Sequence, residues 1–109
     1  MFFRMTTYFF VAASEKFLTL EEPLEEILKE RTRNYKENKK EIDFWLLKKP
    51  SFLKSSQFVD LITKIPYPPA AVISTDKKFI TFLKLRLEFV AVGKFEFPNA
   101  EIKDPFKVE

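Results

Sequence analysis

The chain has 109 residues, of which 46% are hydrophobic and 32% charged, and its formal net charge is +3. This length and balance of residues are typical of one folded domain and not of a disordered chain. Histidine and cysteine are absent and glycine occurs once, which excludes structural zinc sites, Ser–His and Cys–His nucleophiles, disulfides and Gly-rich phosphate-binding loops. Chemistry by carboxylates, lysine or tyrosine stays open, but no catalytic, cofactor-binding or metal-binding motif is recognisable, and we expect a protein that is not an enzyme.

The first part of the chain predicts a strand followed by a helix. Thr6–Ala13 is rich in residues that favour strands, and both of its faces are apolar, as in a central strand covered on both sides. A helix is expected over about residues 21–40, where five residues form a stripe at helical spacing, four of them apolar and the other Arg31. Acidic residues crowd the start of this helix and basic residues its second half. Residues 1–4 are expected to be an N-terminal extension outside the fold.

The middle of the chain predicts a second strand and a second, weaker helix. Ile42–Lys48 alternates apolar side chains between two faces, with Phe44 on one face and Trp45 on the other. Ser51–Ile65 carries a helical pattern with a possible break at its two adjacent serines. Pro66–Pro69 then forms a rigid connector that is not helical.

The last part of the chain predicts a strand, a helix and a final strand. Ala70–Ser74 is a short apolar run, and Asp76 is among the N-cap candidates for a helix from about Lys77 to Leu87. Phe89–Phe97 closes the fold as a strand, in which Gly93 is expected to mark a bulge or kink.

The elements alternate as β-α-β-α-β-α-β, which predicts the α+β class with a single, mostly antiparallel four-stranded sheet and about three helices. At this length the helices are expected mainly on one face, as in an α/β-plait (ferredoxin-like) fold. One domain therefore covers residues 5–97, and the polar, proline-punctuated residues 98–109 form an irregular tail. No apolar run approaches the ~20 residues that a membrane-spanning helix needs.

Three residues are candidates for a protein-contact site. Asp43 directly precedes Phe44, the first of two bulky residues in the second strand. Arg86 follows Phe79 and Phe82 at helical spacing, on the side of the apolar stripe of the third helix. An acid, an aromatic ring and an arginine on one surface would form a typical hot spot of protein recognition. With 14 phenylalanines in so small a domain, some are also expected to form an exposed contact patch.

Two charged stretches admit a functional interpretation beside a plain structural one. The acidic residues of Glu21–Glu26 could bind a cation, and the basic stretch Lys29–Lys40 could contact RNA with Tyr8 and Phe10 as an aromatic row. Solvated helix faces explain both stretches, and the glycine-containing signature of RNA-recognition modules is absent. A plait-type RNA-binding module stays open as an alternative, as does a tetrapyrrole carrier that sets Arg86 against a propionate.

Several segments, in order from about Met5 to Gly93, resemble one small family. The segments are Thr6–Ser14, Glu30–Arg33, Lys40–Leu46, Pro68–Thr75 and Phe79–Glu88, and the most specific pieces are Asp-Phe-Trp-Leu and Phe-Leu-Lys-Leu-Arg-Leu-Glu. The family is the auxiliary protein of the aerobic magnesium-protoporphyrin IX monomethyl ester oxidative cyclase, found in cyanobacteria and as a hypothetical chloroplast reading frame.

The resemblance implies a non-catalytic helper that binds the di-iron catalytic subunit of this cyclase and supports chlorophyll biosynthesis. The residues that it implicates in partner contact are Asp43, Phe44 and Arg86. A protein without histidine is not the usual di-iron catalyst, so it would assist one. By analogy the protein would act in the cytoplasm near thylakoids or in the chloroplast, without nucleic acid and without spanning the membrane.

Overall fold

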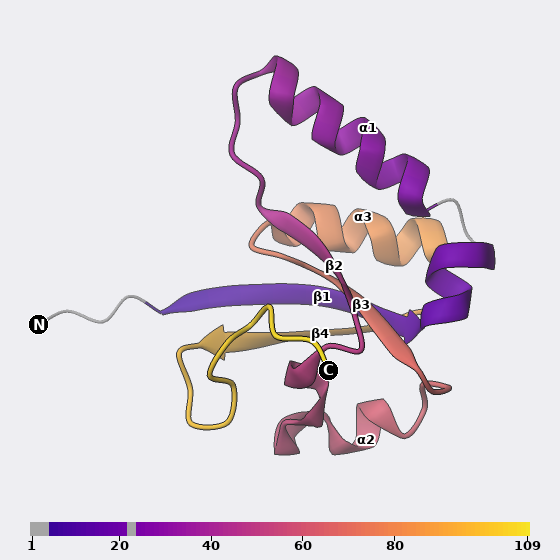
Figure 1. Cartoon of the computed structure of the whole chain (residues 1–109), viewed down its shortest axis with the longest axis vertical. Helices are drawn as coiled ribbons and strands as arrows, with labels where there is room; N and C mark the ends of the chain where they lie inside the picture. The colour runs from indigo at the N-terminus through magenta and orange to yellow at the C-terminus, as the bar shows by residue number, and fades with distance from the viewer. Residues whose placement is uncertain (1–4, 22–23) are drawn as a thin grey trace, which may run out of the picture.

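The computed structural model describes residues 5–21 and 24–109, so the expected extension at residues 1–4 lies outside the described residues. Within these residues, four antiparallel strands form one sheet in the order β2-β3-β1-β4 (Figure 1). The strands are β1 (Thr6–Ser14), β2 (Phe44–Lys48), β3 (Pro69–Ser74) and β4 (Ala91–Phe97), the helices are α1 (Leu24–Glu37), α2 (Val59–Ile62) and α3 (Lys77–Leu87), and short helical turns lie at Phe17–Glu21, Ser51–Lys54 and Ser56–Phe58. This strand order, with α1 after β1 and α3 after β3, confirms the α+β fold of α/β-plait (ferredoxin-like) type.

Both faces of the sheet are covered. The two long helices α1 and α3 lie on one face, while α2 and the two 3-10 turns before it lie on the other (Figure 1). β1 sits between β3 and β4, and its Phe10 and Val11 are fully buried in the cores on opposite faces. The apolar character of both faces of this strand therefore reflects its central position.

α1 ends at Glu37 because the backbone closes a capping turn there. Lys39 has a φ of 54°, a left-handed conformation. The N–H groups of Lys39 and Lys40 donate to the carbonyls of Lys36 and Tyr35, at 3.2 and 2.8 Å. These two bonds satisfy carbonyls at the helix end in the Schellman pattern. The helix is therefore shorter than its charge pattern predicted, and Tyr35 lies in its last turn.

The segment from Ser51 to Ile65 breaks at its two adjacent serines, as its pattern indicated, but most of it is not α-helical. It folds as two 3-10 turns followed by α2, a helix of only four residues. The break falls at Ser55, which has an extended backbone, and the Glu101 carboxylate accepts a hydrogen bond of 3.1 Å from the N–H of Ser56. Because a distant side chain satisfies an amide at this point, the chain begins a new turn instead of continuing one helix.

The tail packs on the same face as α2. Residues 98–109 contain no helix, but Ile102 is 3% exposed and belongs to the core on this face. The N–H of Ser51 donates to the carbonyl of Lys107 at 2.8 Å, which ties the tail to the chain beyond β2. The tail is thus irregular in conformation and at the same time part of the packed structure.

Gly93 lies in a regular strand, and the bulge or kink expected there is absent. β4 pairs with β1 without interruption, and Gly93 lies directly opposite Phe10. A Cβ atom at Gly93 would lie 2.6 Å from the Phe10 ring. Glycine is therefore required here because an aromatic ring approaches the backbone closely.

Gly93→Ala is expected to destabilise the protein by about 1–3 kcal/mol, the usual cost of overfilling a packed core. The Phe10 ring packs edge-on against Phe52 and Phe58, at centroid distances of 4.9 and 5.1 Å, and has little room to yield. Urea unfolding measures the loss, with Val92→Ala at an exposed neighbouring position as the control. Equal stabilities of the two variants would show that the ring moves aside at little cost.

Candidate functional site

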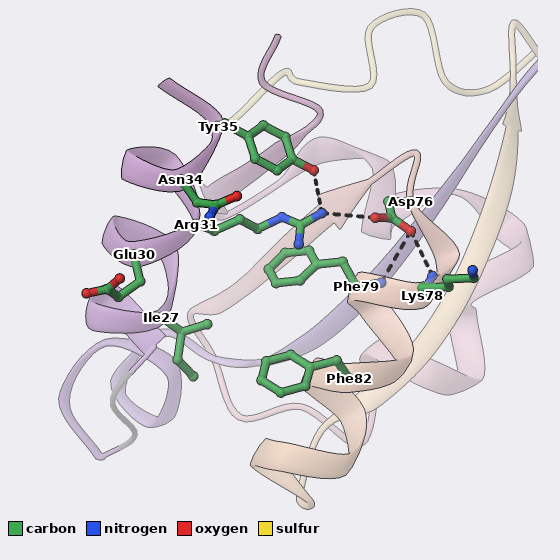
Figure 2. A pocket seen from close by; sticks show the side chains of 9 residues that line it. All are labelled: Ile27, Glu30, Arg31, Asn34, Tyr35, Asp76, Lys78, Phe79 and Phe82. Atoms are coloured by element: carbon green, nitrogen blue, oxygen red, sulfur yellow. Dashed lines mark hydrogen bonds and ion pairs between the residues drawn. The ribbon is translucent and has the colours of Figure 1, made fainter. Parts of the chain in front are cut away.

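A charged cluster joins α1 to the starts of β2 and α3, and Figure 2 shows its members Arg31, Tyr35 and Asp76 at one end of a groove. Nη2 of Arg31 lies 3.0 Å from Oδ2 of Asp76 and 3.8 Å from Oδ1 of Asp43. The same nitrogen donates a hydrogen bond of 2.5 Å to the Tyr35 hydroxyl, which donates in turn to Oδ1 of Asp43 at 2.9 Å. One guanidinium therefore ties together three segments that are distant in the sequence.

Aromatic rings surround the Arg31 guanidinium. Its central carbon lies 3.8 Å from the ring centroid of Phe79, 4.8 Å from that of Tyr35 and 5.2 Å from that of Phe44. Phe44 is 5% exposed and meets Tyr35 and Phe79 edge-on, at centroid distances of 5.3 and 5.5 Å. Contacts between a cation and ring faces stabilise the charge where it is partly desolvated. Phe44 thus supports the cluster from beneath.

Local hydrogen bonds fix the positions of the two aspartates. Asp76 is the N-cap of α3, and its Oδ1 accepts from the N–H groups of Lys78 and Phe79, at 3.0 and 3.4 Å. The buried Ser74 hydroxyl donates to the carbonyl of Asp43 at 2.7 Å and accepts from the N–H of Asp76 at 2.9 Å. Ser74 therefore bridges the start of β2 to the start of α3 and keeps both acids beside Arg31.

The protonation states of the cluster follow from burial and hydrogen bonding. Burial opposes ionisation of Asp76, but hydrogen bonds from Arg31 and from the backbone N–H groups of Phe79 and Lys78 outweigh it and lower the pKa of this carboxyl. Burial, and after it the hydrogen bond to Asp43, raises the pKa of the Tyr35 hydroxyl. At neutral pH Asp76 is therefore an anion and Tyr35 keeps its proton.

A groove of about 520 Å³ lies between α1 and α3 beside the cluster. Figure 2 shows its charged end at Arg31 and Asp76 and its apolar end at Ile27 and Phe82. Phe82 stacks on Phe79 at a centroid distance of 6.4 Å, which connects the apolar end to the rings around the guanidinium. A groove with one charged and one apolar end suits an amphipathic segment of a partner protein.

The outer face of α3 carries an exposed ridge, hereafter the α3 ridge, formed by Phe82, Leu85, Arg86 and Phe89. Phe82 is 49%, Leu85 75% and Phe89 80% exposed, and Arg86 is exposed beside them. The first three residues share one helix face through their i, i+3 and i+4 spacing. Because Phe82 also lines the groove, the ridge and the groove are continuous. Exposed apolar side chains grouped with an arginine are typical of protein-contact surfaces.

A strained turn presents Phe89 at the end of the ridge. Glu88 has φ 61° and ψ −62°, and the N–H of Phe89 donates to the carbonyl of Leu87 at 2.7 Å, which closes a three-residue γ-turn. Nζ of Lys84 braces this turn by donating to the carbonyls of Glu88 and Val90, at 3.0 and 2.9 Å. A non-glycine residue in such a conformation costs about 1–3 kcal/mol. Backbone strain is therefore concentrated beside an exposed ring.

The three contact residues predicted from the sequence occupy two places. Asp43 lies in the Arg31 cluster with a side chain that is 27% exposed, and Phe44 is buried beneath the same cluster. Arg86 lies on the α3 ridge and follows Asp76 by ten residues, which is about 15 Å along a helix axis. The structure thus places the consecutive residues Asp43 and Phe44 at the Arg31 cluster and Arg86 at the other end of α3.

Sequence reasoning missed the roles of Arg31 and Tyr35, which it placed in a helical stripe and in the basic stretch Lys29–Lys40 without an ion-pair partner. A signal was present, because an arginine inside a mostly apolar stripe needs an acid or other acceptors when it is buried. The partner was not readable from the sequence, since Asp76 lies 45 residues away. Asp76 itself was expected as an N-cap candidate, without its contact to Arg31.

The sheet face that would offer Tyr8 and Phe10 to RNA is covered. Phe10 is 0% exposed and lies against Phe52 and Phe58, and Tyr8 packs against Phe106 of the tail at a centroid distance of 5.7 Å. RNA-recognition modules stack bases on an open sheet face. This aromatic row is therefore occupied by packing within the protein.

Residues 5–21 and 24–109 contain no group of three or more acidic, histidine or cysteine side chains placed to hold a metal ion. No helix in the same part of the chain is long and apolar enough to cross a membrane.

Comparison of the sequence with known proteins gives a consistent result. Residues 6–97 match the Ycf54 protein family. The chain is 50% identical over 101 residues to a Ycf54-like protein of Synechocystis, covering 93% of this chain and 76% of that protein. It is 40% identical over 92 residues to the chloroplastic YCF54 protein of Arabidopsis thaliana, covering 84% of this chain and 43% of that protein.

Solved structures agree in fold and in sequence. The crystal structure of the All0216 protein from Nostoc is similar with a TM-score of 0.93 and 53% identity, covering 97% of this chain and 98% of that chain. The structure of the Ycf54 protein from Synechocystis is similar with a TM-score of 0.91 and 47% identity, covering 96% and 98%. With the match to the family over residues 6–97, these likenesses show that the chain belongs to the Ycf54 protein family.

Proposed function

We propose that this chain is a non-catalytic auxiliary and assembly factor that binds the di-iron catalytic subunit of the magnesium-protoporphyrin IX monomethyl ester cyclase and supports chlorophyll biosynthesis. The family is present in cyanobacteria, red algae and a plant, which supports a role common to photosynthetic organisms. The specific partner rests on the resemblance of segments such as Lys40–Leu46 and Phe79–Glu88 to the cyclase auxiliary protein.

The observation that carries a binding role is the α3 ridge, continuous with the groove beside Arg31. Burying a leucine or phenylalanine side chain stabilises a complex by about 1.5–3 kcal/mol relative to leaving it in water. Leu85 and Phe89 are both at least three-quarters exposed, so most of this gain is available to a partner. Arg86 stands among them, and arginine with large apolar side chains dominates hot spots.

The three candidate residues act in different ways in this proposal. Arg86 contacts the partner directly from the ridge. Asp43 offers a partly exposed carboxylate beside Arg31, which lines the charged end of the groove. Phe44 acts through the structure, because its buried ring holds Tyr35 and Phe79 around the Arg31 guanidinium.

The proposed place of action is the surroundings of the thylakoid membrane, in the cytoplasm of a cyanobacterium or in a chloroplast. The plant relative is named a chloroplastic protein, and other relatives belong to cyanobacteria and red algae. These sources support a protein that works where chlorophyll is made.

The proposal is tested by titrating tagged protein against the purified catalytic subunit of the cyclase. Wild type is expected to bind, and the double variant L85S/F89S is expected to bind roughly 10- to 100-fold more weakly because two hot-spot side chains are lost. Its urea unfolding should stay within about 0.5 kcal/mol of wild type, since both positions are exposed. Arg86→Ala is expected to weaken binding about tenfold.

The matched control is Val59→Ser, which removes a 55% exposed apolar side chain from α2 on the opposite face of the sheet. It is expected to bind like wild type. If L85S/F89S binds as tightly as this control, the α3 ridge is not the contact surface. If wild type itself does not bind the catalytic subunit, the proposed partner is wrong.

A further inference from the structure

β4 is one edge strand of the sheet, and near its end the Glu96 carbonyl accepts a hydrogen bond of 2.6 Å from Nδ2 of Asn99. Among the residues that the structure describes, β4 pairs with β1 alone, through an unbroken register from Ala91 to Phe97. At the opposite edge strand β2, the tail pairs with the chain just beyond the strand, where the N–H of Glu109 donates to the carbonyl of Lys49 at 3.0 Å. An edge strand whose other outward backbone groups have no partner strand is a template on which another strand can pair, with the Asn99 side chain giving way at Glu96.

On the helix-bearing face of the sheet, β4 and the residue after it present an apolar, a basic, an acidic and again an apolar side chain. Val92, Lys94 and Glu96 lie on this face, and all three are exposed. The Thr7 hydroxyl donates to both carboxylate oxygens of Glu96, at 2.7 and 2.8 Å, and so fixes this side chain above the sheet. Pro98 follows at the next position in the series and is exposed as well.

This series of side chains is self-complementary when β4 pairs antiparallel with β4 of a second copy. A two-fold axis through Phe95 would place Lys94 opposite Glu96 of a second copy, and Glu96 opposite Lys94 of that copy. The same register places Val92 opposite Pro98, an apolar contact. Opposite charges directly across two strands contribute roughly 0.2–1 kcal/mol for each pair.

Neighbouring registers lack this complementarity. A two-fold axis perpendicular to the sheet keeps the helix-bearing faces of both copies on the same side. Each residue therefore pairs only with a residue whose side chain points to the same face, and the axis must pass through a residue. The two neighbouring registers have their axes one residue away from Phe95, at Lys94 or at Glu96. With the axis at Lys94, two lysines face each other, and with the axis at Glu96, two glutamates do. Like charges directly opposite are destabilising.

The other face of the strand accepts the same register. Phe95 meets Phe95 of the second copy at the axis, and Gly93 lies opposite Phe97 of that copy. An aromatic ring across from a glycine covers backbone that carries no side chain, an arrangement used in designed sheets. Aromatic pairs across strands also favour association.

We propose that the β4 edge binds the β4 edge of a second copy of this chain, in the antiparallel register centred on Phe95, to form a continuous sheet across a two-fold dimer. A lysine on an edge strand often keeps edges apart. Here Glu96 supplies the matching charge two residues further on, so Lys94 selects one register instead. α3 packs over β1 and β3, so Phe82 and Leu85 of the α3 ridge do not lie over β4.

The first test uses the absence of native cysteine. The variants K94C and E96C are purified, mixed in their otherwise native, full-length form and oxidised. Directly opposite residues have Cβ atoms about 4.5–5.5 Å apart, close to disulfide distance, whereas two copies of position 94 lie diagonally at about 7–8 Å. A crosslinked heterodimer in the mixture, and little crosslink in either variant alone, is expected. Crosslinking equal in all three samples, or in none, overturns the register.

The second test exchanges the charges. Sedimentation equilibrium of wild type is expected to show a monomer–dimer equilibrium, because one strand pair buries less surface than a standard stable interface of about 1,600 Å². K94E should weaken dimerisation roughly tenfold, and the double variant K94E/E96K should restore it. A wild type that stays monomeric at roughly millimolar concentration, or a double variant as weak as K94E, overturns the proposal. Binding of the cyclase subunit through the α3 ridge is measured separately and does not depend on this result.

Discussion

Replacing Phe44 with alanine is expected to destabilise the protein by about 3–5 kcal/mol, the usual cost of removing a buried phenylalanine ring. The ring is 5% exposed and packs against Tyr35, Phe79 and the Arg31 guanidinium. A domain of this size has only about 5–15 kcal/mol of stability, so a large part of it would be lost. Urea unfolding followed by circular dichroism measures the effect.

Phe82→Ala is the matched control, because it removes the same ring from a position that is 49% exposed. It is expected to cost about 1 kcal/mol or less in stability and to weaken partner binding while the protein stays folded. Phe44→Ala should lose binding in proportion to the fraction that unfolds. Equal losses of stability in Phe44→Ala and Phe82→Ala would contradict the supporting role assigned to Phe44.

Replacing Arg31 with methionine is expected to destabilise the protein by about 2–4 kcal/mol. Removing one partner of a fully buried ion pair costs about 3–5 kcal/mol, and the side chains of Arg31, Asp43 and Asp76 are 21, 27 and 32% exposed, so the cost is reduced by solvent screening. Methionine keeps much of the side-chain volume, so the loss reports mainly the guanidinium. Urea unfolding at neutral pH measures it.

Arg33→Met provides the control on the same helix. Arg33 pairs with Glu30 at 2.7 Å, but the two side chains are 66 and 68% exposed. Exposed pairs of this kind contribute about 0–1 kcal/mol, and the variant should unfold close to wild type. If Arg31→Met is no more costly than Arg33→Met, the Arg31 cluster does not hold α1 to the rest of the fold.

The effect of Arg31 is expected to decrease in acid. Because the folded state lowers the pKa of Asp76 below its ordinary value of 3.8, wild type keeps this contribution above that value and loses it as the pH falls through the folded pKa. The hydrogen bond from Arg31 is one cause of the lowered pKa, so Arg31→Met is less sensitive to this titration. A stability difference between the two proteins that stays constant from about pH 7 to about pH 2 would contradict this account.

The elements that the sequence predicted well are those whose signals are local. Alternation with a period of two marked β2, and the N-cap preference for aspartate marked the start of α3 at Asp76. The pattern of Ser51–Ile65 indicated the break at the two serines but not the 3-10 turns on either side of it. Glu101, more than forty residues away, satisfies the amide of Ser56 and restarts the turn. Gly93 was assigned to a bulge because the sequence could not show the Phe10 ring above it.

For the candidate site, the sequence indicated residue types without their environments. It pointed to Asp43, Phe44 and Arg86, and the structure places the first two at the Arg31 cluster and the third on the α3 ridge. Apolar residues at helical spacing predict an apolar helix face, but the spacing does not show which of these residues another element covers. Leu85 and Leu83 are both apolar residues of α3, yet one is 75% exposed and the other fully buried.

The sequence by itself determined the α+β class, the order of the strands and helices along the chain, and the exclusion of histidine- and cysteine-based chemistry. These follow from local periodicity, capping residues and composition, which do not depend on distant contacts. Only the tertiary structure decided that Arg31 meets Asp76, that Phe44 is a buried support, and that Phe82 and Leu85 on the outer face of α3 are exposed among the described residues. The reason is physical: burial and ion pairing depend on which distant segments the sheet brings together, and that pairing has no local signature in the chain.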